Sequence, residues 1–154
     1  MTNLPRKHLF DMPPGDIYLN GNSLGPLPVG VAERAAQVVS EEWGGELIRA
    51  WNTRDWIGAP LRVGAQIARL IGAPSDSVSV GETLTIKVFQ ALAAALAMQP
   101  DRRVILSEDG NFPTDLYMAE GLVALKGAGY ELRVVAPDAL EAAIDTDVAA
   151  VLVT

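Results

Sequence analysis

Apolar residues recur at helical spacing in the first third of the chain. Over residues 28–43 they fall every three or four positions, which predicts an amphipathic helix, and Gly44-Gly45 is expected to end it. A second helix is predicted over residues 60–71, with a proline suited to its first position and Gly72 as its stop. Residues 1–27 are rich in proline and glycine and predict an irregular arm.

From residue 78 onward, short apolar runs alternate with helical segments. Strands are predicted at residues 78–80, 103–107, 132–136 and 149–154, and helices at residues 86–98, 113–126 and 137–144. The last strand is almost entirely apolar, as burial on both faces of a sheet requires. This alternation predicts an α/β fold of right-handed βαβ units, with a parallel or mixed sheet and helices on both faces. Because the chain stops inside its last predicted strand, we expect a fragment of a longer protein.

Composition narrows the classes of function. The 154 residues are 49% apolar and 20% charged, as in an ordinary soluble globular chain, and no apolar stretch is long enough to span a membrane. The absence of cysteine excludes thiolate chemistry and suits a cytoplasmic protein. A net charge of −7 without a large basic cluster argues against nucleic-acid binding. The single histidine, His8, excludes a metal site of several histidines.

The segment Gly81-Glu82-Thr83-Leu84-Thr85 lies between a predicted strand and a predicted helix. In open α/β sheets, ligands bind at the carboxyl ends of strands, and the free N–H groups of a helix start hold phosphate. The threonine hydroxyls add donors. The alternative is that Thr83 or Thr85 only caps the helix, and from the residues alone that alternative is somewhat favoured. Neither a Walker lysine nor a dinucleotide-binding glycine motif is present.

A second strand end carries Asn111-Phe112-Pro113-Thr114-Asp115. Asn111 can cap the following helix, Pro113 suits its first turn, and Asp115 complements its dipole. Phe112 is not explained by these roles. Its ring either belongs to the core or lies face to face with a planar cofactor, and the residues alone do not separate the two. At a third strand end stands Thr154, for which an ordinary strand terminus is the simpler reading.

Three segments, in order, resemble kynureninase, a pyridoxal-phosphate (PLP) enzyme of fold type I. They are Tyr18-Leu19-Asn20-Gly21-Asn22-Ser23-Leu24-Gly25, the stretch over residues 41–52, and Asn111-Phe112-Pro113-Thr114-Asp115-Leu116-Tyr117. The third is the most specific, and the resemblance runs from about residue 17 to residue 154. It implies the large domain of fold type I over residues 59–154, preceded by an N-terminal arm, helix and substrate-side segment over residues 1–58.

The resemblance also implies roles for individual residues. Cofactor-binding positions are matched by Leu84, Thr85, Phe112, Pro113, Thr114, Asp115 and Thr154, with the first two at the phosphate and Phe112 stacked on the pyridine ring. Ser23 and Trp51 match positions that line the substrate pocket, and a packing role is the alternative for Trp51. The family's Schiff-base lysine would lie beyond Thr154, because none of Lys7, Lys87 and Lys126 matches it. We therefore expect no catalytic residue in this segment and no activity from it alone.

The activity implied by the resemblance is hydrolysis of L-kynurenine, or of 3-hydroxykynurenine, to the anthranilate product and L-alanine by a cytoplasmic homodimer. Another fold type I enzyme, such as a cysteine desulfurase or an aminotransferase, is one alternative. A non-catalytic α/β binding or scaffold protein is the other.

Overall fold

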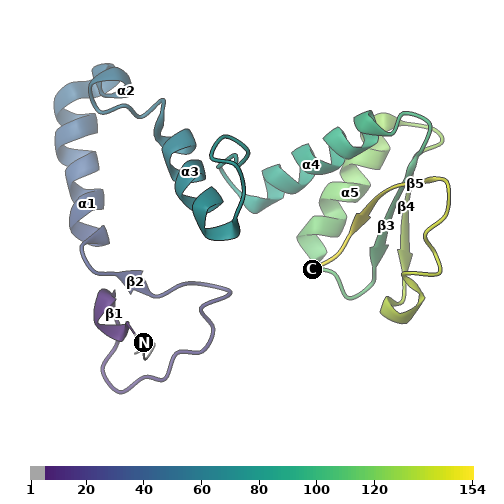
Figure 1. Ribbon diagram of the computed structural model, residues 1–154, viewed down its shortest axis with the longest axis horizontal. Coiled ribbons are helices and arrows are strands. Elements are labelled where there is room, and N and C mark those ends of the chain that lie inside the picture. Colours follow the sequence, from purple (N-terminus) through teal and green to yellow (C-terminus); the bar gives the residue numbers. More distant parts are fainter. Residues whose placement is uncertain (1–5) are drawn as a thin grey trace. The chain divides into compact units, whose positions relative to one another are not determined.

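The computed structural model describes residues 6–154, which divide into two compact units, Met1–Val63 and Gly64–Thr154. Figure 1 shows the elements of both units along the chain.

The first unit opens with an arm of little regular structure. A 3₁₀ turn, η1 (Lys7–Leu9), leads into β1 (Phe10–Asp11), which pairs antiparallel with β2 (Leu27–Pro28). The residues between these two short strands form an irregular loop. The irregular arm predicted over residues 1–27 is thus confirmed apart from this pair, and Pro5 and its predecessors lie outside the described residues.

The helix predicted over residues 28–43 is present but has different ends. It starts as α1 (Val31–Gln37) and continues as η2 (Val38–Glu46), a stretch of wider π-helical turns. The predicted stop at Gly44-Gly45 is wrong, because the helix passes through both glycines. A Cβ at Gly44 would lie 3.2 Å from the carbonyl oxygen of Val39, five residues earlier. Glycine here permits the wide turn and does not end the helix.

The rest of the unit is a series of short helical pieces. The helix ends where Leu47 takes a positive φ of 54°, and η3 (Leu47–Arg49) and α2 (Ala50–Thr53) follow. The next element, α3 (Ala59–Ile71), begins in this unit, continues past Val63 into the second, and confirms the helix predicted over residues 60–71. Gly72, with φ 71°, follows it in the left-handed conformation expected after a helix.

The second unit contains a three-stranded parallel sheet in the order β4-β3-β5. Its elements are α4 (Leu84–Met98), β3 (Val104–Glu108), α5 (Pro113–Lys126), β4 (Glu131–Val135), η4 (Pro137–Ala139) and β5 (Val148–Leu152). The α/β class and the parallel pairing are confirmed. Three of the predicted strands and two of the predicted helices in this unit are present within two residues of their expected bounds.

The core lies on both faces of the central strand β3. On one face Ile105 packs with Leu92 and Leu96 of α4 and with Ala119 and Leu122 of α5. Figure 1 shows these two helices side by side on the same side of the strands. On the other face a smaller cluster forms around Leu106 and is covered by the segment after β4. In the described chain, helices therefore cover one face only, contrary to the prediction of helices on both.

Two predicted elements are wrong. Residues 78–80 form no strand, because they pair with neither edge of the sheet and a strand requires a hydrogen-bonded neighbour. Residues 137–144 form η4 and further turns instead of a helix. Arg133 of β4 donates to the carbonyl of Ala143 at 3.4 Å and to the carboxylate of Asp145 at 2.7 Å. These bonds hold the segment against the strand, and eight residues are too few for a helix to form on propensity alone.

No helix among residues 6–154 has the length and apolar character needed to cross a bilayer.

Candidate functional site

A buried polar cluster lies where β3 and β5 end. Ser107, fully buried on β3, donates its hydroxyl to the carbonyl of Leu152 on β5 at 2.8 Å. The side-chain amide of Asn111 donates to the same carbonyl at 3.0 Å and to the Ser107 hydroxyl at 2.9 Å. These bonds join the carboxyl ends of two neighbouring strands, which is the edge where ligands of such sheets bind.

Phe112 stands at the N-cap position of α5 and places its ring outside the core. Its backbone N–H donates to Oδ1 of Asn111 at 2.6 Å, and its side chain is 61% exposed. Asn111 therefore does not cap the helix, contrary to the prediction, because its amide is engaged with the strands and with Phe112. Pro113 takes the first helical position as expected, and Thr114 follows on the surface.

Asp115 is the unusual group at this helix start. Its side chain is only 3% exposed, and its Oδ1 atom has no hydrogen-bond partner in the described chain. A buried carboxylate oxygen without a partner is costly, although the positive end of the α5 dipole offsets part of that cost. The residue therefore has capacity left for a hydrogen-bond donor from outside these residues.

The two threonines at the start of α4, Thr83 and Thr85, have different roles. Thr83 is the N-cap, and its hydroxyl accepts from the N–H of Ile86 at 3.3 Å, so the capping alternative is correct for Thr83. The N–H groups of Leu84 and Thr85 lie in the first turn, where a helix supplies no acceptor. Leu84 is exposed and Thr85 is half-buried. Two N–H groups and one hydroxyl thus remain available for an anion.

These segments share one edge of the second unit. Thr154 lies two residues beyond Leu152, whose carbonyl the cluster holds, and Phe112 directly follows Asn111. Because α4 leads into β3 and packs back along it, the helix begins on the side where β3 ends (Figure 1). The structure thus brings the predicted residues of α5 together with the end of β5, and α4 starts toward the same edge.

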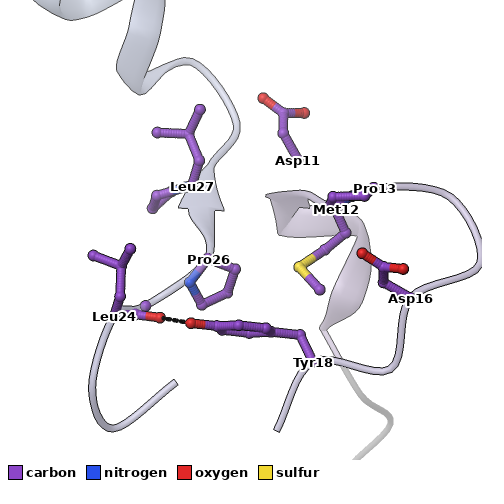
Figure 2. Close-up of a pocket in the computed structure, with 10 residues that line it drawn as sticks. Asp11, Met12, Pro13, Asp16, Tyr18, Leu24, Pro26 and Leu27 are labelled. Atoms are coloured by element: carbon purple, nitrogen blue, oxygen red, sulfur yellow. Dashed lines mark hydrogen bonds between the residues drawn. The ribbon is translucent and has the colours of Figure 1, made fainter. Parts of the chain in front are cut away.

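Ser23 lies in a loop that Tyr18 closes. The Tyr18 hydroxyl donates to the carbonyl of Leu24 at 2.6 Å, and the N–H of Ser23 donates to the carbonyl of Asn20 at 3.1 Å. Figure 2 shows the Tyr18 ring beneath Met12 and beside the chain that leads into β2. The ring lines an apolar hollow of about 560 Å³ between the arm and the loop. Ser23 is exposed on this loop and does not line the hollow.

Trp51 lies in a second apolar hollow of the first unit, lined by Val38, Trp43, Leu47, Ile48, Trp51 and Trp56. Its ring meets that of Trp56 edge to face, with centroids 6.4 Å apart and an interplanar angle of 69°. The Trp51 side chain is 48% exposed, so it packs on one side and remains open on the other. Both the packing role and the substrate-facing role are compatible with this geometry.

A buried carboxylate anchors the tryptophan segment. Glu42 on η2 accepts from the indole N–H of Trp56 at 2.7 Å and pairs with Arg34 at 2.5 Å. The hydrogen bond from Trp56, followed by that from Arg34, lowers the pKa of Glu42 below its ordinary value. On the next turn, hydrogen bonds from Arg54 and Thr53 lower the pKa of Glu46 in the same way. Both carboxylates thus hold residues 47–58 onto the preceding helix.

Sequence reasoning missed several residues that shape these sites. The position of Glu42 in its helical repeat did not predict its hydrogen bond with Trp56, fourteen residues later. No sequence pattern predicted the side-chain hydrogen bonds of Ser107 or Tyr18. The one available signal was Asn111, a polar residue directly after a buried strand. Within residues 6–154 no group of three or more acidic or histidine side chains is arranged to hold a metal ion.

Comparison with known proteins gives a consistent result. The chain is 48% identical to a kynureninase of Burkholderia mallei (strain SAVP1) and to one of Pseudomonas fluorescens, and 47% identical to one of Burkholderia pseudomallei (strain 1106a). Each match covers 97% of this chain and 37% of the relative. The resemblance seen in the motifs is confirmed, and the chain spans about a third of the length of the curated relatives it matches. No family model matches the chain.

Proposed function

We propose that the complete protein is a PLP-dependent hydrolase that cleaves L-kynurenine to anthranilate and L-alanine. The observation that carries this proposal is the 48% identity to kynureninases over 97% of the chain. The geometry is compatible with this proposal, because Phe112 and Asp115 follow the end of β3 and Thr154 follows the end of β5, at the edge where ligands of parallel sheets bind. We further propose that the fold is that of the fold type I large domain over residues 59–154, with residues 1–58 on the substrate side.

The fit of a PLP molecule can be tested against the side chains of that edge. The N–H groups of Leu84 and Thr85, with the Thr85 hydroxyl, offer donors suited to a phosphate at the start of α4. The exposed ring of Phe112 offers a flat apolar face to a pyridine ring. The unpartnered Oδ1 of Asp115 offers an acceptor to a donor on the cofactor or on the chain around it. These properties fit the group.

In this proposal each matched residue has a defined task. Leu84 and Thr85 bind the phosphate, Phe112 covers the ring, and Pro113, Thr114 and Asp115 complete the contact from the first turn of α5. Thr154 contacts the cofactor from the end of β5. When bound, PLP supplies an electron sink for bond cleavage in an amino-acid substrate.

The substrate side is assigned to Ser23 and Trp51. Trp51 presents a half-open indole, which can pack against the aniline ring of kynurenine or 3-hydroxykynurenine. A pocket for a small aliphatic amino acid has no evident use for such a ring. We also propose, from the resemblance, that the active protein is a cytoplasmic homodimer.

The test is an assay of the complete protein with L-kynurenine and added PLP. We expect anthranilate, followed by its fluorescence, and alanine, measured in parallel, to appear in equal amounts. A keto acid in place of this pair would replace the proposal with an aminotransferase activity. No turnover and no PLP binding would favour a non-catalytic α/β protein.

A further inference from the structure

The Asn111 side chain makes three hydrogen bonds within the buried cluster, which use both of its donors and its acceptor oxygen. Its amide nitrogen donates one hydrogen to the Ser107 hydroxyl and the other to the Leu152 carbonyl, while Oδ1 accepts from the N–H of Phe112. Asn111 is 4% exposed and Ser107 is fully buried. A rotated amide would turn its oxygen toward the carbonyl of Leu152, so only one orientation satisfies every group.

These bonds connect three segments: two strands and the turn between β3 and α5. They tie together the end of β3 at Ser107, the turn that leads into α5, and the end of β5 at Leu152. The turn places Phe112 at the helix start, and β5 delivers Thr154 two residues after the bonded carbonyl. One amide therefore fixes the distance between the two strand ends that carry Phe112 and Thr154.

The buried polar side chains of residues 64–154, which are Ser107, Asn111 and Asp115, all lie at the end of β3 or at the start of α5. The opposite face of the same strand is closed by apolar side chains around Leu106, and a buried polar group stabilises a fold only when every hydrogen bond is made. The amino end of β5 offers a comparison. There the exposed Arg102 donates to the carbonyl of Val148 at 3.1 Å, and this bond also holds β5 against its neighbour.

We propose that Asn111, supported by Ser107, is a positioning residue that holds the Phe112 ring and Thr154 in a fixed relation to a bound pyridoxal cofactor. This inference rests on the proposed function. Asn111 itself does not touch the cofactor in this role. It acts through the backbone N–H of Phe112 on one side and through the β5 carbonyl on the other.

The test uses the complete protein, PLP as the ligand, and two readouts: the dissociation constant for PLP and the visible circular dichroism of the bound cofactor. Asn111→Ala removes all three bonds, and we expect PLP binding to weaken about tenfold or more, the scale of losing buried hydrogen bonds. We also expect the dichroism band to change, because the ring above the cofactor is no longer held. Asn111→Asp keeps the acceptor for Phe112 but loses both donors, so it should not restore binding.

Arg102→Ala is the matched control, since it removes a bond to the other end of β5. It should lower the melting temperature while PLP affinity stays within about twofold and the dichroism band is unchanged. Equal changes in affinity for the Asn111 and Arg102 variants, at equal loss of melting temperature, would overturn the positioning role. If Asn111→Ala does not fold, Ser107→Ala, which removes the supporting hydroxyl, decides by the same two readouts. A wild-type protein that binds no PLP would instead refute the proposed function.

Discussion

The two units of the chain hold their predicted site residues in different ways. In residues 64–154 a buried strand and the starts of two helices carry Thr85, Phe112 and Asp115, so regular structure sets their backbone positions. In residues 6–63 Ser23 lies in a loop closed by the Tyr18 hydroxyl, and Trp51 packs on Trp56, which Glu42 holds by a side-chain hydrogen bond. The proposed cofactor side thus belongs to the regular structure of the sheet unit, whereas the proposed substrate side depends on local side-chain contacts.

This difference suits the two tasks. A cofactor of fixed shape is well served by rigid elements, because small displacements of a binding group reduce its interaction strongly. A substrate must enter and leave, and loops or short helical pieces can move to admit it. The two regions should therefore differ in stability, in cofactor binding and in substrate use.

The largest effect is expected in the core of the second unit. Leu122 of α5 is 1% exposed and packs against Ile105 of β3. Leu122→Ala should lower the free energy of unfolding by about 2–5 kcal/mol. Leu19→Ala, at an 87% exposed position of the arm, is the matched control and should change it by less than about 0.5 kcal/mol. Urea unfolding of the 154-residue chain, followed by circular dichroism, measures both. Equal losses would show that the arm is as well packed as the sheet.

Cofactor binding should respond next, through the start of α4. In the complete protein, Thr85→Ala removes one hydroxyl from the proposed phosphate contact and should weaken PLP binding by about 1–2 kcal/mol. Thr146→Ala, at an exposed turn before β5, makes the same chemical change away from that edge and should leave affinity unaltered. Titration with PLP by absorbance gives both constants. A similar loss of PLP affinity in the two variants would contradict the assignment of the phosphate site to the start of α4.

The parts of the fold that sequence could predict are those with a strong local signal. The span of α5 follows from Pro113 at its start and Gly127 after its end, and β3 follows from the three consecutive apolar residues with which it begins. The failures are non-local. Residues 78–80 carry a strand-like pattern but lack a pairing partner, and residues 137–144 carry a helix-like pattern that bonds from Arg133 override.

The candidate site shows the same limit. Its residue types could be found because polar and aromatic residues follow predicted strands. Their mutual arrangement could not, because Asn111 reaches Leu152, 41 residues later, through its side chain. The unpartnered oxygen of Asp115 was equally hidden, since burial depends on how α5 packs. The spacing of residues along the sequence predicts neither the Asn111–Leu152 hydrogen bond nor the burial of the Asp115 oxygen.

On the proposed substrate side, Trp51→Ala in the complete protein should lower kcat/KM for L-kynurenine. The corresponding loss of transition-state stabilisation should be about 0.5–1.5 kcal/mol, the scale of an aromatic contact. Because Trp51 lies in the first unit, PLP affinity should change less than kcat/KM does. Trp51→Phe keeps an aromatic ring and should retain most of the activity. If Trp51→Ala instead unfolds the first unit, or reduces PLP binding and kcat/KM equally, Trp51 is a packing residue.

The smallest effect concerns how pH acts on the tryptophan segment. The pKa of Glu42 is lowered by its hydrogen bonds to Trp56 and Arg34 in the folded chain. A carboxyl whose folded pKa lies below its unfolded pKa contributes stability that is present above the unfolded value, about 4.3. That contribution is lost as the pH falls through the folded pKa. Acidification through the lowered pKa of Glu42 should therefore release Trp56 and change tryptophan fluorescence before the sheet unfolds.

Glu42→Gln separates the charge from the hydrogen bond. The amide oxygen can still accept from the indole N–H of Trp56, but it cannot be protonated in this range and forms no ion pair with Arg34. The acid-induced fluorescence change should therefore shrink or disappear in this variant. Glu33→Gln, at an exposed position of α1, should preserve it. An unchanged acid profile in Glu42→Gln would mean that another group releases the tryptophans, and that the first unit is not held by this carboxylate.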